Sequence, residues 1–130
     1  MALSKAFQKY PEHRIEIDAE RVHARVTQNG RVLAETTAGL NMKEGKYPAV
    51  VYIPREDVFM QHLEPTDHST HCPFKGDASY FDVGTSEKSG DGEPIREVAW
   101  SYETPFDQMA AIRGHLAFYA DRVEIEIIQG

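Results

Sequence analysis

Six consecutive residues, His71-Cys72-Pro73-Phe74-Lys75-Gly76, bring together side chains that could do chemistry. They include the only cysteine of the chain, with a histidine before it and a lysine shortly after it. A positive charge beside a thiol lowers its pKa from about 8.5 and raises the fraction of reactive thiolate. Cys72 is therefore a candidate nucleophile or redox thiol, with Lys75, His71 or Arg55 as the neighbouring cation. The alternative is structural, because free cysteine is among the residue types most often buried.

Two cations and two acids are further candidates. Lys75 and Arg55 each adjoin a glycine or a proline, and either could present a positive charge to the carboxylate or phosphate of a small ligand. Asp57 and Glu44 could act as general bases if a pocket removed them from water. Arg55 could equally form a structural ion pair, and Asp57 could stabilise the start of a helix. Both interpretations stay open from the sequence alone.

Aromatic residues on several predicted strands could converge into one wall. Such a wall could stack a planar ligand or surround a cation, although aromatic residues on strands more often belong to the core. The residues are Tyr52, Tyr80, Trp100, Tyr102 and Tyr119.

The six histidines do not predict a metal site. His68 and His71 are close enough in sequence to share one, but no His-x-x-x-His pair on a helix accompanies them. A single cysteine also excludes a multi-cysteine zinc site. We therefore expect no bound metal, and no other cofactor is indicated.

Alternating apolar and polar residues place most of these candidates on strands. From Arg21 to Glu35 two alternating runs are separated by Asn29-Gly30, whose residues tolerate the positive φ angles of a two-residue hairpin turn. We expect further strands at 37–44, 49–53, 78–83, 95–103, 115–119 and 122–127, although residues 40–44 could equally form a helical turn. Seven or eight short strands without a long amphipathic helix predict a mainly β, antiparallel domain.

Two short helices are expected where prolines interrupt the strand pattern. Pro54 would begin a helix over residues 55–63, and a second would cover residues 105–112. The polar segments 64–70 and 84–94 are predicted to be loops, and the first of them leads into the cysteine hexapeptide.

Length and charge limit the classes of function. The 130 residues fit one domain, so we expect an N-terminal arm at 1–11 and a single β-rich domain at 12–130. A net charge of −7 argues against a nucleic-acid partner, because lysine and arginine supply most of the affinity for phosphates. The chain has no apolar run of about 18 residues that could span a membrane and no signal-peptide pattern. These observations predict a cytoplasmic, non-membrane protein.

Several ordered landmarks resemble a bacterial family known as domain of unknown function 427. They are Tyr52-Ile53-Pro54-Arg55-Glu56-Asp57-Val58, His71-Cys72-Pro73-Phe74-Lys75-Gly76-Asp77-Ala78-Ser79-Tyr80, Ala99-Trp100-Ser101-Tyr102-Glu103-Thr104-Pro105 and Ile112-Arg113-Gly114-His115-Leu116-Ala117-Phe118-Tyr119. The resemblance implies a small β-tent-like domain, a shape shared with zinc-binding modules and methionine sulfoxide reductases. Where the family often has Ala-Asp-Ser, this chain has Ala34-Glu35-Thr36, which carries a longer acid.

The family is also named for nucleotidyl transfer. The sequence has no Gly-Ser pair followed by two spaced aspartates that would hold magnesium, and it has no glycine-rich loop that would hold phosphates. We therefore do not expect that reaction.

The leading hypothesis is a pocket that binds a small polar or anionic organic molecule. Its predicted lining is Tyr52, Arg55, Cys72, Lys75, Tyr80, Trp100 and Tyr102, with Cys72, Lys75 and Asp57 as candidate catalytic residues. One alternative is a thiol-dependent enzyme or redox protein that uses Cys72. Another is a protein-interaction module in which the motifs only hold the fold. The oligomeric state is not indicated by the sequence.

Overall fold

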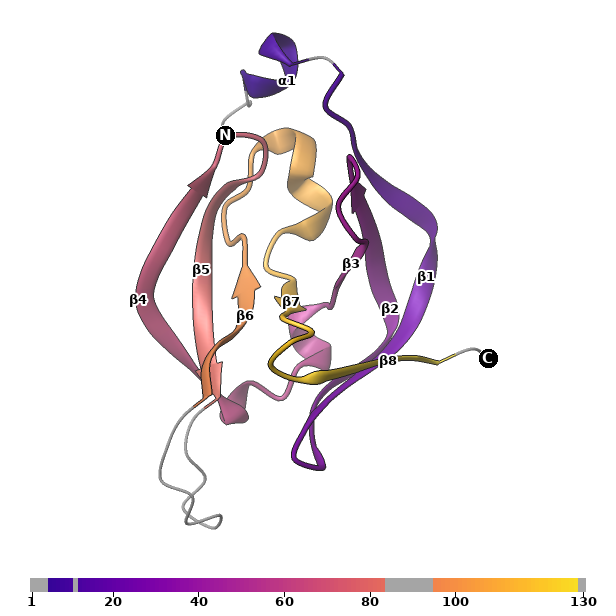
Figure 1. The fold of residues 1–130 in the computed structure, drawn as a ribbon, viewed down its shortest axis with the longest axis vertical. Helices are drawn as coiled ribbons and strands as arrows, with labels where there is room; N and C mark the ends of the chain where they lie inside the picture. Colours follow the sequence, from indigo (N-terminus) through magenta and orange to yellow (C-terminus); the bar gives the residue numbers. More distant parts are fainter. Residues whose placement is uncertain (1–4, 11, 84–94, 129–130) are drawn as a thin grey trace.

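The computed structural model describes residues 5–10, 12–83 and 95–128, and it contains two four-stranded antiparallel sheets (Figure 1). The first sheet has the strand order β3-β2-β1-β8, and the second has the order β4-β5-β6-β7. The first comprises β1 (Ile15–Gln28), β2 (Arg31–Glu44), β3 (Val50–Tyr52) and β8 (Glu124–Ile128). The second comprises β4 (Leu63–Cys72), β5 (Gly76–Val83), β6 (Ile95–Ser101) and β7 (Leu116–Phe118). The prediction of a mainly β, antiparallel fold is confirmed.

The β1–β2 hairpin forms where the sequence predicted it. Asn29 and Gly30 both have positive φ, 52° and 77°, as the short turn requires. The segment 37–44 is a strand, as expected, and it continues β2 against both β1 and β3. Gly39 is needed there, because a Cβ atom at this position would lie 2.8 Å from the Val51 side chain of β3.

The two sheets are joined along one side. Ile53, just after β3, donates a backbone hydrogen bond of 2.7 Å to the carbonyl of Leu116 in β7, and Leu116 donates one of 2.8 Å in return. This bridge brings the β3 edge of one sheet beside the β7 edge of the other. The tyrosine and tryptophan side chains near this junction are thereby brought together.

The two predicted helices are 3₁₀ turns instead. The segment expected to be a helix at 55–63 holds η1 (Arg55–Asp57) and η2 (Met60–His62), and these turns carry the chain from one sheet to the other. Between them, Phe59 donates its backbone N–H to the Leu33 carbonyl of β2, so this group is not available to a continuous helix. The second segment is η3 (Asp107–Ile112), and its φ/ψ angles are non-helical at Met109.

The predicted loop at 64–70 is wrong, because these residues belong to β4. β4 lies at the edge of its sheet and is exposed along most of its length. With neither face buried, such a strand does not need the apolar alternation from which strands are predicted, and Pro65 is tolerated at an edge. In the predicted arm, residues Ala6–Lys9 form a short helix, α1. The predicted loop at 84–94 lies outside the described residues.

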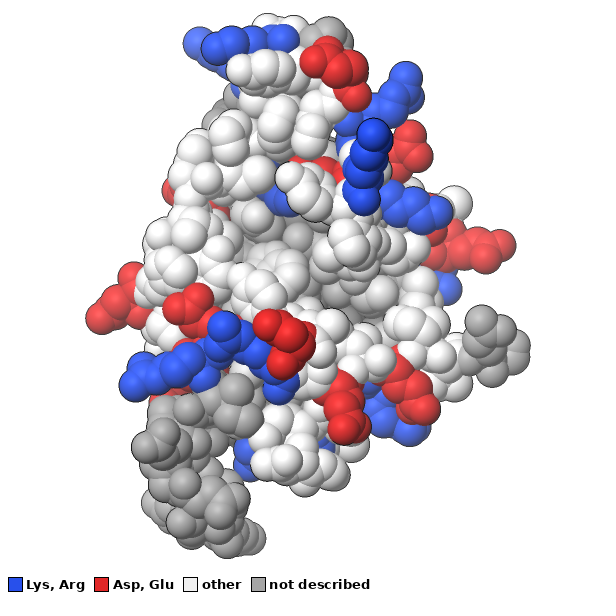
Figure 2. Space-filling model, in the orientation of Figure 1, with Lys and Arg blue, Asp and Glu red and all other residues white. Residues whose placement is uncertain are grey.

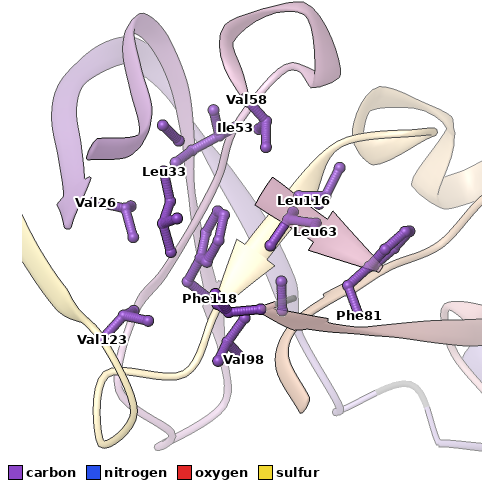
Figure 3. Close-up of a cluster of buried hydrophobic side chains, with 13 residues drawn as sticks. Val26, Leu33, Ile53, Val58, Leu63, Phe81, Val98, Leu116, Phe118 and Val123 are labelled. Carbon is purple, nitrogen blue, oxygen red and sulfur yellow. The ribbon is translucent and has the colours of Figure 1, made fainter. Parts of the chain in front are cut away.

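Side chains from both sheets form two groups of buried residues. The first core cluster is aliphatic apart from two phenylalanines (Figure 3). It consists of Val26, Leu33, Ala34, Ile53, Val58, Leu63, Phe81, Val83, Val98, Ala99, Leu116, Phe118 and Val123. The second core cluster consists of Leu40, Met42, Tyr52, Ala78, Tyr102, Met109, Ile112 and Ala117. No helix among the residues that the structure describes is long and apolar enough to cross a membrane.

Candidate functional site

A cavity of about 190 Å³ lies beside the second core cluster, between residues of the two sheets. We call it the inter-sheet cavity. Its walls come from β2, β3, β5 and β6 and from residues that follow β2, β4, β6 and β7. The lining residues are Met42, Glu44, Tyr47, Pro48, Val50, Tyr52, Lys75, Tyr80, Trp100, Tyr102 and Tyr119.

Trp100 organises the aromatic part of the wall. Its indole N–H donates a hydrogen bond of 3.1 Å to the hydroxyl of Tyr52, and the two rings meet edge to face with centroids 6.3 Å apart. On its other side the ring of Tyr119 lies tilted with its centroid 4.5 Å away. The bridge between β3 and β7 makes this possible, because it brings β3, which carries Tyr52, beside the end of β7, which precedes Tyr119.

A lysine and a glutamate form an ion pair in the wall of the cavity. Lys75 Nζ donates to Glu44 Oε1 at 2.6 Å, and His13 Nε2 lies 3.0 Å from Glu44 Oε2. The side chains of Lys75 and Glu44 are only 12% and 16% exposed. Burial raises the pKa of the Glu44 carboxyl, but the hydrogen bonds and charges of Lys75 and His13 outweigh burial and hold it below its usual value. The glutamate is therefore ionised at neutral pH.

The hydroxyls of Tyr52, Tyr102 and Tyr119 in the cavity wall are neutral hydrogen-bond donors at neutral pH. Burial raises the pKa of Tyr52 and Tyr102, and burial together with Tyr80 raises the pKa of Tyr119 to about 12. The Tyr52 hydroxyl is used by Trp100. The Tyr102 side chain makes no hydrogen bond with any of the described residues, although Tyr102 is only 6% exposed. Among the side chains of the described residues, only the Ser101 Oγ is both sealed from solvent and without a hydrogen-bond partner, so the Tyr102 hydroxyl can be reached by a ligand or by water.

Tyr80 connects the cavity to the exposed strand β4. Its hydroxyl lies 2.7 Å from that of Thr70, and its ring stacks on His68 with centroids 4.4 Å apart. His68 Nδ1 in turn lies 3.0 Å from the carboxylate of Glu97. Glu97 has a positive φ of 47°, which is uncommon for a residue with a side chain. These contacts hold the Tyr80 ring in place from outside the cavity.

Five of the predicted pocket residues line this one cavity, and Arg55 does not. The five are Tyr52, Lys75, Tyr80, Trp100 and Tyr102. The guanidinium of Arg55 donates to the Glu103 carboxylate and, at 3.2 Å, to the Gly114 carbonyl. It also lies 5.7 Å from the centre of the Phe81 ring. Arg55 therefore ties together three distant segments, which is the structural interpretation of this residue.

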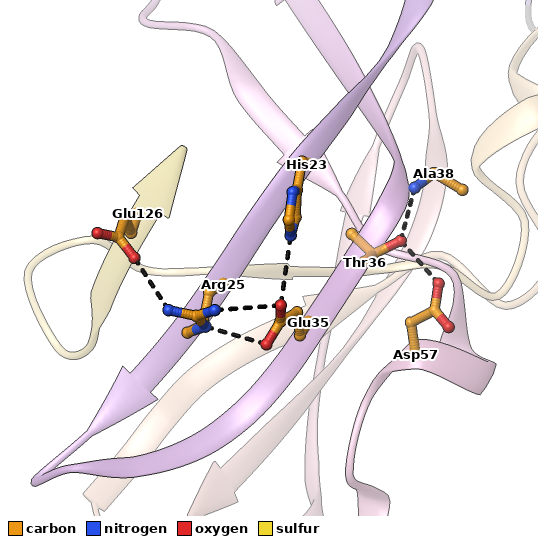
Figure 4. Close-up of polar contacts among 7 residues, drawn as sticks. All are labelled: His23, Arg25, Glu35, Thr36, Ala38, Asp57 and Glu126. Carbon is orange, nitrogen blue, oxygen red and sulfur yellow. Dashed lines mark hydrogen bonds and ion pairs between the residues drawn. The ribbon is translucent and has the colours of Figure 1, made fainter. Parts of the chain in front are cut away.

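Asp57 also lies away from the cavity lining, and it has a structural partner (Figure 4). Its carboxylate accepts a hydrogen bond of 2.7 Å from the hydroxyl of Thr36, whose oxygen accepts the backbone N–H of Ala38 at 2.9 Å. The neighbouring Glu35 extends to Arg25, which donates two hydrogen bonds to its carboxylate at 2.9 and 3.2 Å. The hydrogen bond from Arg25 is the main reason that the pKa of Glu35 is below its usual value.

Cys72 is half-buried at the end of β4 and packs against the second core cluster. It does not line the inter-sheet cavity. Lys75, one of its predicted activating cations, is paired with Glu44. The neighbouring His71 is exposed and pairs with Asp77 at 2.8 Å. Across the ranges 5–10, 12–83 and 95–128, no three His, Cys, Asp or Glu side chains are grouped so that they could hold a metal ion.

Sequence reasoning missed four lining residues: Met42, Tyr47, Pro48 and Val50. All four lie in or beside the turn between β2 and β3, where Met42 pairs with Val50. The signal was present in the sequence, because Gly45-Lys46-Tyr47-Pro48 follows the candidate acid Glu44 and reads as a turn. Such a turn places its side chains over the end of the strand pair that it connects.

Comparison with known families identifies the family of the chain. The family model described as domain of unknown function (DUF427), with the short name NTP_transf_9, matches residues 16–129. No curated protein matches the chain. The matched range covers the eight strands, apart from the first residue of β1, and all of the cavity lining. The chain therefore belongs to the DUF427 family.

Proposed function

We propose that this DUF427 domain binds a small planar molecule that carries hydrogen-bond acceptors, and that the inter-sheet cavity is the binding site. The observation that carries the proposal is the pair of donors in an aromatic wall, Tyr102 and Lys75. The Tyr102 hydroxyl has no partner among the described residues, and Lys75 gives only one hydrogen bond to a side chain, that to Glu44. Both lie in the same lining. A ligand with acceptor atoms would satisfy donors that the fold itself does not use.

The aromatic side chains favour a planar ligand. Flat rings offer extended contact area, and offset or edge-on arrangements between rings are favourable beyond the area that they bury. Trp100 and Tyr119 lie tilted at 46° to each other, and Tyr52 meets Trp100 at 89°. A flat ligand could therefore meet one ring by its face and another by its edge.

Volume and charge restrict the ligand further. The 190 Å³ of the cavity is below the range of about 300–1,000 Å³ that is common for drug-sized ligands, so the ligand, or the part of it held here, is small. Lys75 and Glu44 neutralise each other, so the lining carries no net charge to reject a neutral molecule. A carboxylate or an amide could accept hydrogen bonds from Tyr102 and Lys75, whereas an organic cation would be repelled by the positive charge of Lys75.

The test uses three small aromatic probes of similar size: benzoate, benzamide and benzylammonium. Trp100 is the only tryptophan of the chain, so its fluorescence reports on the cavity directly. We expect benzoate and benzamide to change this fluorescence and to raise the melting temperature, and benzylammonium to do neither. Nucleoside monophosphates in the same assay test the nucleotide-related name of the family.

Two variants localise the effect. Tyr102→Phe keeps the ring and removes the unpartnered hydroxyl, so it should weaken the binding of benzoate and benzamide by at least about tenfold. Arg55→Ala removes a cation that lies outside the cavity lining and should leave their affinity unchanged. The proposal is wrong if neither acceptor-bearing probe binds, or if Arg55→Ala weakens binding and Tyr102→Phe does not.

A further inference from the structure

A second hollow adjoins the inter-sheet cavity. It has a volume of about 530 Å³, and it shares Pro48, Val50, Trp100 and Tyr119 with the cavity. The rest of its wall comes from β1, β2, β3 and β8 and from the end of β7. We call it the apolar groove. Its remaining lining residues are Val22, Asn41, Ala49, Val51, Phe118, Ala120, Ile125 and Ile127.

The chemistry of the groove differs from that of the cavity. None of its lining residues is charged, and Asn41 is the only one with a carboxamide side chain. Ile127 is 48% exposed, which makes it one of the few large apolar side chains that the described surface leaves in water. Figure 2 shows that uncharged side chains form the recessed centre of the face where β3, β7 and β8 lie, while most charged side chains surround it. Contiguous apolar surface of this kind commonly marks a binding site.

We propose that the ligand is amphipathic, with its planar polar head in the inter-sheet cavity and an uncharged apolar tail in the apolar groove. This inference rests on the proposed function, because it assigns the head group to the same cavity. It adds the class of ligand: an aryl or heterocyclic acid or amide that bears a hydrocarbon chain.

The two hollows adjoin, which is the reason to assign the groove to the same ligand. Trp100 and Tyr119 line both, so a chain attached to a ring beside Trp100 would extend along these two side chains into the groove. The cavity is too small for a long molecule, whereas the groove has more than twice its volume. The amide of Asn41 in its wall already donates a hydrogen bond of 2.9 Å to the Asp18 carboxylate, so a hydrocarbon beside it does not remove that partner.

The shape of the groove favours a narrow chain over a protein partner. Most of its apolar wall is half-buried or buried, including Val22, Val51, Phe118 and Ile125, and the exposed members lie at its rim. A second copy of this chain would need protruding side chains to reach these recessed surfaces. Ile127 is the only large apolar lining residue that is itself exposed, so little area is offered to a flat protein surface.

The experiment is a homologous series of 4-alkylbenzoates from benzoate to 4-hexylbenzoate, titrated against the full chain with Trp100 fluorescence as the readout. Each methylene that enters the groove should tighten binding by about fourfold, which corresponds to about 0.8 kcal/mol for a buried CH₂. Affinity that does not change with chain length, while benzoate itself binds, overturns the tail assignment and leaves the proposed function standing. If no member of the series binds, both proposals fail.

Variants at the rim show where the tail lies. Ile127→Glu and Ala120→Glu put a charge at an exposed position of the groove, where folding tolerates it, and both should flatten the dependence of affinity on chain length. Phe59→Glu is the matched control, because Phe59 is 45% exposed and lines neither hollow. In Phe59→Glu, each added methylene should still tighten binding by about fourfold. If each methylene still tightened binding by the same factor in both Ile127→Glu and Ala120→Glu, the inference would be contradicted.

Size-exclusion chromatography tests the remaining possibility, which is that a second copy of the chain occupies the apolar groove. A single monomeric peak at every concentration, with or without 4-hexylbenzoate, is expected. Concentration-dependent dimers that disappear in Ile127→Glu would assign the groove to a second copy of the chain and overturn the proposal.

Discussion

The same two sheets enclose two interiors of opposite character. The first core cluster is formed by aliphatic side chains and two phenylalanines, and its members include Val26, Leu33 and Leu116, all 0% exposed. The inter-sheet cavity, beside the second core cluster, is surrounded by tyrosines, one tryptophan and a buried ion pair. The first arrangement contributes to stability in proportion to the apolar area removed from water. The second encloses hydroxyl and charged groups that a fold of this size could replace by aliphatic residues, which is why we assign function to it.

The largest effect on the free energy of unfolding is expected from a substitution in the first core cluster. Leu33→Ala removes a side chain that is 0% exposed, and the loss of buried area plus the cavity left behind should lower the free energy of unfolding by about 2–5 kcal/mol. Urea denaturation measures this value. The affinity of the remaining folded protein for benzoate should not change, because Leu33 does not line the inter-sheet cavity. A loss of stability below about 1 kcal/mol would mean that the two interiors do not differ as argued.

Lys75→Met should have an intermediate effect on stability. It removes the cation that pairs with Glu44 at 2.6 Å and leaves the half-buried carboxylate with His13 alone. A lost hydrogen bond to a charged group lowers the free energy of unfolding by about 1–3 kcal/mol. Lys43→Met is the matched control, because its side chain is 57% exposed and its pair with Asp18 is 3.6 Å long. Exposed pairs contribute little, so equal losses in both variants would contradict a special role for the buried pair.

Acid should destabilise the protein partly through Glu44. Its pKa in the folded state lies below the usual value of 4.5, so the stabilisation from its charge is complete above pH 4.5 and is lost as the pH falls through the folded-state pKa. Glu44→Gln should therefore lose less stability than the natural chain over this acid range in urea denaturation. Glu35→Gln is a useful comparison, because the pKa of Glu35 is also lowered, but its side chain is more exposed, at 39% against 16% for Glu44. High salt should remove the contribution of Glu35 and leave that of Glu44.

Local turn chemistry made part of the fold predictable from the sequence. Asn29-Gly30 predicts its hairpin because few other residues adopt positive φ without strain. β4 was not predictable by the same approach, because a strand exposed along most of its length needs no apolar alternation. The 3₁₀ turns after Pro54 were mistaken for a helix because the competing partner of Phe59, the Leu33 carbonyl, is distant in sequence.

The candidate site was predictable mainly for residues on strands or directly after them. Tyr80 and Trp100 face each other on the paired strands β5 and β6, and the bridge between β3 and β7 brings Tyr52 beside them. Arg55 is only three positions beyond Tyr52, yet it lies in a 3₁₀ turn whose direction depends on distant contacts, and it faces Glu103 instead. Which groups the fold satisfies and which it leaves available, as at Tyr102, depends on three-dimensional neighbours that no pattern records.

The smallest effect on stability is expected at Tyr102, and it is the most informative for the comparison. Because its hydroxyl makes no hydrogen bond with the described residues, Tyr102→Phe should change the free energy of unfolding by less than about 0.5 kcal/mol. Tyr52→Phe, in contrast, leaves the Trp100 indole N–H without its acceptor. This variant should lower the free energy of unfolding by about 1 kcal/mol. Both values follow from urea denaturation, with benzoate affinity measured in parallel. If Tyr102→Phe weakens benzoate binding but leaves stability unchanged, the Tyr102 hydroxyl serves the ligand and not the fold. If Tyr102→Phe instead loses as much stability as Tyr52→Phe, the Tyr102 hydroxyl belongs to the structural interior.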